Sequence, residues 1–276
     1  MTISSATGII HIDPDRRPIK TSNTTWRIRL TLVILAFLLI WQAAVAWFKL
    51  IPSNFLPAPT EVSVAFGELV VNPNFWSALA FSLGNMAVGL AMAIGVGVFV
   101  GIALGLSPAL RITVAPFLWL LYSTPKVALA PIFILALGLG SASKIGLVFL
   151  LAVFPVLLNT MEGTLTVSPS LVNAARVYGA SRFSVGWKII APATLPFSLV
   201  GIQRAVALGF TGEILGEFLG GAGGIGHMLE YAAYKFLMDE ALAIVFVMVI
   251  VSNLSLGLIS IVRRKLAPWD TDQKGM

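Results

Sequence analysis

The chain has 276 residues, of which 58% are hydrophobic and 11% charged, and its mean hydropathy of +0.93 leaves too little polar surface for a soluble fold. Its net charge of +6 does not indicate nucleic-acid binding, because the cationic residues are scattered between apolar segments as topogenic signals are. The absence of cysteine excludes disulfides, thiolate metal sites and cysteine nucleophiles. From the hydropathy and the length we predict an all-α integral membrane protein with about six transmembrane helices of ~20 residues each.

The N-terminal residues 1–29 are polar and basic, and we expect them to form a cytoplasmic tail. The apolar run Leu30–Trp47 follows. A cleaved signal peptide is the alternative, because basic residues precede an apolar run. The run is longer than a usual signal core and lacks a clear small-x-small cleavage site, so we interpret it as the first retained span.

The segment Lys49–Trp76 is rich in proline and is predicted to be an external loop with a short interfacial helix at Thr60–Val71. The second span is expected at Ser77–Leu106, where repeated glycines would let neighbouring helices approach closely on more than one face.

The third apolar segment, Ile112–Leu139, is too long for one straight helix across a hydrocarbon core of ~30 Å, so we predict a break at Pro125. Lys126 follows this break and either snorkels or faces an internal cavity. Gly138–Lys144 is predicted to be an external turn, and Ile145–Met161 to be the fourth span with a kink at Pro155.

The polar stretch 165–192, here called the elbow, predicts two short helices joined at a glycine. Ser168 is an N-cap candidate with proline after it, and the first helix should run to about Tyr178. Gly179 supplies the left-handed residue that ends this helix, and Ser181 can cap a second helix that should end before Pro192. The small residues would let another surface approach, so the elbow is a docking surface or, alternatively, an ordinary connector.

The fifth span is predicted at Phe197–Leu219 and contains Arg204, Glu213 and Glu217. The two glutamates are spaced i, i+4 and share one helix face, whereas Arg204 points roughly the opposite way. The glycine-rich run Gly220–Gly226 is predicted to be an external turn, because a phosphate-binding loop would follow a strand and continue into Lys-Ser or Lys-Thr.

The segment His227–Asp239 is predicted to be interfacial, with His227 a polar residue at headgroup level rather than a metal ligand. Glu240–Val262 is the predicted sixth span, and the basic run from Arg263 ends it. We expect a single transmembrane domain at 30–265 and a cytoplasmic C-terminal tail at 266–276.

The positive-inside rule supports this topology with both termini in the cytoplasm. Only Lys49, Lys144 and Lys235 would lie outside, and Lys126 and Arg204 would lie within spans, while the other Lys and Arg residues fall on the cytoplasmic side. The elbow is therefore expected in the cytoplasm.

Within the elbow, Asn173-Ala174-Ala175 is followed by Gly179, Ile189 and Pro192 at a spacing that resembles the cytoplasmic EAA loop of ABC importer permeases. Asn173 stands where that family usually has Glu, and Ala191 where it usually has Leu. The flanking motifs resemble the nitrate/sulfonate/taurine-type branch of binding-protein-dependent permeases, over roughly Phe55–Trp269. These motifs are Pro125, Pro131, Gly138-Leu139-Gly140, Lys144, Pro192–Pro196, Gly201–Arg204 and Gly223–Gly226.

The resemblance implies the type I ABC importer permease fold in a bacterial inner membrane, and a non-catalytic subunit surrounded by lipid. It implies two copies of a separate cytoplasmic ATPase that uses the ATP, since this chain has no nucleotide-binding motif and is expected to bind no cofactor. It also implies a second permease copy as a homodimer and a periplasmic or lipid-anchored binding protein. The ATPase-coupling residues that it implies are Asn173, Ala174, Ala175, Arg176, Gly179, Ala180, Ile189 and Pro192.

The substrate implied by the resemblance is a small anion such as nitrate, a sulfonate, taurine or bicarbonate, although similar permeases carry pyrimidine vitamin precursors. The candidate pathway residues are Lys126, Arg204, Glu213 and Glu217. Arg204 has a structural alternative, a fixed ion pair with a carboxylate on another helix.

Two other function classes are weaker alternatives. A secondary transporter would more often show inverted repeats and paired intramembrane carboxylates. A membrane-embedded enzyme would need a nucleophile or a metal cluster, and the chain offers only His11 and His227.

Overall fold

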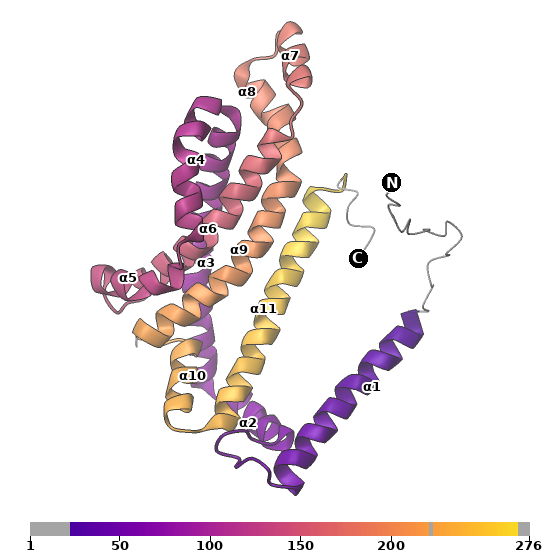
Figure 1. Ribbon diagram of the computed structural model, residues 1–276, viewed down its shortest axis with the longest axis vertical. Helices are drawn as coiled ribbons and strands as arrows, with labels where there is room; N and C mark the ends of the chain where they lie inside the picture. The colour runs from indigo at the N-terminus through magenta and orange to yellow at the C-terminus, as the bar shows by residue number, and fades with distance from the viewer. Residues whose placement is uncertain (1–22, 221–222, 270–276) are drawn as a thin grey trace, which may run out of the picture. The chain divides into compact units, whose positions relative to one another are not determined.

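The computed structural model describes residues 23–220 and 223–269, and in that part every regular element is a helix (Figure 1). The chain divides into two compact units, residues 1–50 and 51–276, which are described separately. The division into tails and one domain at 30–265 stays a prediction. Most of the predicted N-terminal tail, and the end of the C-terminal tail from residue 270, lie outside the described residues.

In the described part of the first unit, from residue 23 onward, the chain forms one long helix. It comprises α1 (Asn23–Gln42) and a π-helical turn, η1 (Ala43–Trp47). Large apolar side chains are exposed all along α1 from Trp26 to Ile40. A helix that is apolar all round is suited to lipid rather than water. The stretch Trp26–Trp47 is long and apolar enough to cross a membrane, in agreement with the first span predicted at Leu30–Trp47.

The second unit contains the remaining helices and two irregular turns. In chain order they are α2 (Pro59–Val71), α3 (Pro73–Leu106), α4 (Pro108–Ser123), η2 (Lys126–Leu129), α5 (Ala130–Leu137), α6 (Ser141–Leu165), α7 (Pro169–Val177), α8 (Arg182–Val185), η3 (Gly186–Ile190), α9 (Ala191–Gly220), α10 (Ile225–Tyr234) and α11 (Met238–Leu266).

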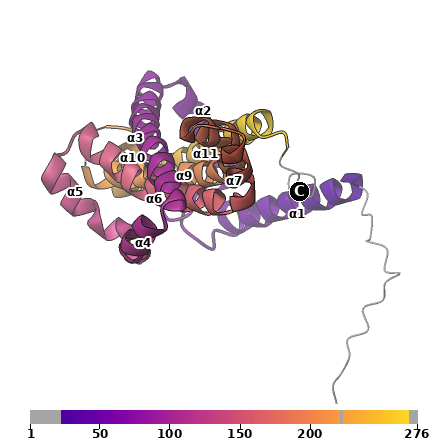
Figure 2. The same ribbon diagram turned by 90° about the horizontal axis from the view of Figure 1, so that it is seen from above.

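Helix α6 lies at the centre of this unit, between α3 and α9, as the view along the bundle shows (Figure 2). Every residue from Leu151 to Met161 is buried. Glycines on both neighbours allow this close contact: a Cβ added at Gly101 of α3 would lie 2.7 Å from the Leu157 carbonyl oxygen, and one at Gly201 of α9 would lie 2.7 Å from the Pro155 carbonyl oxygen. Small residues at these crossings hold the three-helix core together by direct backbone packing.

The number of spans agrees with the sequence. Five described helices are long and apolar enough to cross a membrane, and α4 with η2–α5 forms a sixth, bent pair. The two arms of this pair meet at 85°, at the break predicted at Pro125. Helix α3 begins at Pro73, earlier than the predicted Ser77, because the Asn72 side chain caps it by accepting a hydrogen bond from the Asn74 amide at 2.9 Å.

The predicted short helix at Thr60–Val71 is confirmed as α2, which begins at Pro59. The Glu61 carboxylate accepts a hydrogen bond of 2.7 Å from the Ala58 amide and fixes its first turn. The buried faces of α2, α3, α10 and α11 form a second apolar cluster. This cluster and the elbow lie at opposite ends of the unit (Figure 1).

The prediction that the second elbow helix ends before Pro192 is wrong. Helix α8 continues through the π-helical turn η3 into α9, so that Arg182–Gly220 is one continuous helical stretch. In this wider turn the Ala191 amide donates to the Gly186 carbonyl, five residues back. A π-type turn shifts the hydrogen-bond ladder by one residue, and Pro192 can then follow in the first turn of α9.

Candidate functional site

The elbow folds as the sequence predicts around its glycine. Helix α7 ends at Val177, and Gly179 adopts a φ of +81°, a conformation that residues with a Cβ rarely adopt. The Ser181 hydroxyl caps α8 by accepting from the Ser184 amide at 3.2 Å. Ser168 occupies the N-cap position of α7, but its hydroxyl contacts the Ser170 hydroxyl at 2.6 Å instead of capping the helix.

The surface of the elbow is open and partly aromatic. Among the predicted coupling residues, Asn173, Ala174, Arg176 and Gly179 are exposed, and Ala175, Ala180, Ile189 and Pro192 are half-buried. Tyr178, Phe183 and Trp187 are 90%, 82% and 71% exposed. Sequence reasoning missed these aromatics, although large rings in a polar segment beside a glycine turn are themselves a sign of a contact surface.

A hollow of about 550 Å³ lies between the elbow and the turn that joins α3 to α4. Arg111, Arg176 and Arg182 line it together with Asn173. Asn173, which stands where the EAA pattern usually has glutamate, therefore lies beside three cations. This end of the unit presents positive charge to whatever binds the elbow.

A second hollow, here called the arginine hollow, measures about 400 Å³ and opens between α4, α6 and α9. Its lining includes Trp119, Tyr122, Asn159, Glu162 and Arg204. The Arg204 Nη1 donates to the Asn159 Oδ1 at 3.4 Å. Within the described residues no carboxylate lies at ion-pair distance from Arg204, so the fixed ion pair considered from the sequence is not formed within this copy of the chain.

Lys126 lies beside the arginine hollow, at the bend between α4 and η2. Its amine donates to the Tyr122 carbonyl at 2.8 Å and lies 4.8 Å from the centroid of the Tyr122 ring and 5.0 Å from that of Phe154. A cation that binds a carbonyl in the last turn of a helix stabilises that terminus. Lys126 thus holds the bend at the end of α4, and its place in a pathway stays a prediction.

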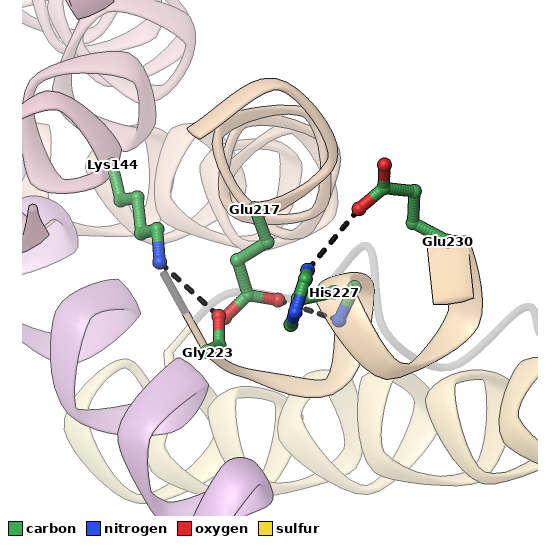
Figure 3. Close-up of polar contacts among 6 residues, drawn as sticks. Lys144, Glu217, Gly223, His227 and Glu230 are labelled. Atoms are coloured by element: carbon green, nitrogen blue, oxygen red, sulfur yellow. Dashed lines mark hydrogen bonds and ion pairs between the residues drawn. The ribbon is translucent and has the colours of Figure 1, made fainter. Parts of the chain in front are cut away.

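Glu213 and Glu217 lie elsewhere, in a buried polar cluster at the far end of α9, and Figure 3 shows Glu217 with its neighbours. The Glu217 Oε1 accepts from the Ser82 hydroxyl at 2.6 Å, and its Oε2 accepts from the Gly226 amide at 2.7 Å. The Ser82 hydroxyl in turn accepts from the Ile225 amide at 2.9 Å. Glu217 therefore joins α9, α3 and the start of α10.

Lys144 belongs to the same cluster, and the prediction that it lies in a turn is wrong. It lies in the first turn of α6, it is fully buried, and its amine donates to the Gly223 carbonyl at 3.1 Å (Figure 3). Helix α6 begins at Ser141, before the predicted start, and this brings Lys144 against α9. Asn85 donates to the Glu213 Oε1 at 3.0 Å on the other side of the cluster. The four predicted pathway residues thus divide between two places.

Removing the Glu217 carboxylate should destabilise the α9–α10 connection. In Glu217→Ala the Gly226 amide loses its buried acceptor, whereas the Ser82 hydroxyl can still donate to the Ala78 carbonyl at 3.1 Å, so we expect a loss of ~1–3 kcal/mol from the one unsatisfied group. The measurement is the midpoint of thermal unfolding in detergent. Glu230→Ala is the control, because Glu230 is half-buried and contacts only the nearby His227 ring, at 3.1 Å. Equal midpoints for the two variants would show that the cluster does not hold this end of the unit.

The comparison with protein families decides what this helical unit belongs to. Residues 93–269 match the family described as binding-protein-dependent transport system inner membrane component. The chain belongs to that family. It is the permease subunit of an ABC importer and a multi-pass protein of the inner membrane, and it works with an ATPase and a substrate-binding protein.

The names of several similar proteins state a substrate. The permease is 33% identical over 249 residues to the taurine transport system permease protein TauC of Escherichia coli, which covers 88% of this chain and 90% of TauC. It is 30% identical over 236 residues to a Bacillus subtilis protein provisionally named aliphatic sulfonates transport permease SsuC. That match covers 86% of this chain and 85% of SsuC. It is 27% identical over 244 residues to the formylaminopyrimidine transport permease protein ThiX of Halalkalibacterium halodurans. That match covers 88% of this chain and 96% of ThiX.

Proposed function

We propose that this permease imports a small sulfonate-class anion. The observation that carries the proposal is Arg204, a cation in the middle of α9 whose side chain is exposed in the arginine hollow. A charged side chain at bilayer depth costs at least ~2.5–3.5 kcal/mol on insertion scales, so it belongs in a protein-lined or watery space. The names of TauC and SsuC support a sulfonate over nitrate or bicarbonate, and ThiX supports the runner-up, a pyrimidine vitamin precursor.

The working unit in this proposal is two copies of the permease with two ATPase subunits. Each copy has one elbow, and an importer driven by two ATPases needs two. The open side of the arginine hollow would face the second copy across the pathway, which keeps Arg204 away from lipid. Closure of the ATPases would rock the two copies between inward- and outward-open states.

The elbow is proposed as the contact with the ATPase, with Gly179 setting the angle between α7 and α8. Asn173, Ala174, Arg176 and Tyr178 supply its exposed surface, and the arginines of the neighbouring hollow supply its positive charge. Both chain termini would then be cytoplasmic. The basic end of α11 lies at the same end of the unit as the elbow, which supports this orientation for the C-terminus (Figure 1).

The permease is proposed to be non-catalytic and to bind no cofactor, since hydrolysis of ATP is the chemistry of its partner. Reconstitution in liposomes with its ATPase and binding protein tests the whole proposal. We expect ATP-dependent uptake of radiolabelled taurine or ethanesulfonate. Uptake restricted to a formylaminopyrimidine, or uptake driven by an ion gradient without ATP, would overturn it.

A further inference from the structure

The arginine hollow contains charges of both signs. Glu162 of α6 lines it and is exposed, and it lies one helical turn beyond Asn159, the residue that binds Arg204. A plain anion would gain from Arg204 and would be repelled by Glu162. The Lys126 amine beside the hollow is already bound to the Tyr122 carbonyl, so Glu162 remains as a carboxylate that a simple anion would not use.

We propose that the arginine hollow binds a zwitterion, with its sulfonate at Arg204 and its ammonium group at Glu162. The substrate is then an aminosulfonate rather than a simple alkanesulfonate. This inference rests on the proposed function and narrows its substrate class.

The Arg204 end has donors to spare. A guanidinium has five N–H donors in a planar fork, and among residues 23–220 and 223–269 the Arg204 side chain makes one hydrogen bond, from its Nη1 to Asn159. The remaining donors match two oxygens of an oxoanion in a bidentate pair. The bond to Asn159 fixes the direction in which the fork points, so the binding geometry is prepared before the ligand arrives.

The Glu162 end has a free acceptor. Within the described residues no Lys, Arg or His lies at ion-pair distance from its carboxylate. Arg204 is turned toward Asn159 instead, so the two opposite charges do not neutralise each other across the hollow. A pair of unlike charges kept apart in this way is complementary to a ligand that carries both.

The two ends of the proposed site are held by neighbouring positions of one helix. Asn159, which binds Arg204, and Glu162 are three residues apart on α6, a rise of about 4.5 Å. Trp119 and Tyr122 form the wall of the hollow on α4, where their rings can contact the carbon chain of the ligand. Trp119 is the ring that can attract the ammonium group, because the Lys126 amine already lies 4.8 Å from the centroid of the Tyr122 ring.

The test is the ratio of taurine uptake to ethanesulfonate uptake in liposomes that contain the full permease, its ATPase and one unchanged binding protein. These two ligands differ by the ammonium group alone. We expect Glu162→Gln to lower this ratio about tenfold, which corresponds to ~1.4 kcal/mol. The exposed Glu162 side chain makes no hydrogen bond or ion pair with the part of the chain that the structure describes, so this variant should assemble normally. Glu162→Asp should keep part of the preference, and Glu68→Gln on the exposed surface of α2 is the matched control.

The outcomes separate the inference from the proposed function. Equal losses for both ligands in Glu162→Gln, or an unchanged ratio, would overturn the zwitterion site and leave sulfonate import standing. Import of ethanesulfonate but not taurine by the unaltered permease would do the same. Import of neither ligand would overturn the proposed function and the inference with it.

Discussion

Replacing Gly179 with valine should uncouple ATP hydrolysis from transport while the permease still inserts and assembles. Gly179 has a φ of +81°, and a Cβ added there would meet nothing within 4 Å. The effect is therefore conformational and not a clash: a residue with a Cβ pays ~1–2 kcal/mol in this region and will shift toward a negative φ. That shift changes the angle between α7 and α8 and misplaces the exposed elbow surface.

The measurement is substrate-stimulated ATP hydrolysis by the complete complex in liposomes. Gly186→Val is the matched control, because Gly186 also has open space around its Cβ position but has a helical φ of −57°. We expect stimulation to be lost in Gly179→Val and retained in Gly186→Val. Normal stimulation in a well-assembled Gly179→Val complex would count against the coupling role of the elbow.

Replacing Arg204 with methionine should reduce uptake of a sulfonate to background. Methionine keeps much of the length of the side chain but removes its charge and every N–H donor. The bond to Asn159 and the positive charge of the arginine hollow are both lost. Basal ATP hydrolysis should persist, because Arg204 lies in the membrane-spanning part of α9 and not in the elbow.

Lys126→Met is the comparison for Arg204→Met. It also removes one positive charge near the arginine hollow, but it leaves the proposed binding group, Arg204, in place. The Lys126 amine is bound to the Tyr122 carbonyl, so this substitution removes one helix-end contact, worth ~0.3–1 kcal/mol, and we expect a partial loss of uptake. Complete loss in Lys126→Met would show that Lys126 lines the pathway, which is one of the two roles that the sequence leaves open, and unchanged uptake would show that it only snorkels. Unchanged uptake in Arg204→Met would remove Arg204 from the pathway.

Local sequence signals were sufficient for most of the fold. Apolar runs of membrane length predicted the spans, and Pro125 predicted the break that the structure shows as an 85° bend. The elbow followed from Pro169, Gly179 and Ser181, since each of these residues acts on its own neighbouring backbone groups. The family resemblance came from the spacing of the same segment and is confirmed by the match over residues 93–269.

What the sequence did not reveal depends on contacts between distant segments. Pro192 normally ends a helix, but the π-helical turn before it allows α8 and α9 to join. Lys144 looks like a residue of a turn, and only the packing of α6 against α9 shows that it is buried near Glu217. Glu162 had no motif of its own, and it becomes a candidate ligand only because α4, α6 and α9 enclose a common hollow.

Contact between the elbow and the ATPase is the central claim, and cross-linking from a single cysteine tests it most directly. The chain has no cysteine of its own, so any introduced thiol is unique. Helices α7 and α10 lie at opposite ends of the unit (Figure 1). Tyr178, directly after α7, and Tyr234, the last residue of α10, are 90% and 82% exposed. With a short thiol-reactive cross-linker, Tyr178→Cys should give a permease–ATPase product in membranes, and Tyr234→Cys should give none. A product from Tyr234→Cys alone would contradict the claim.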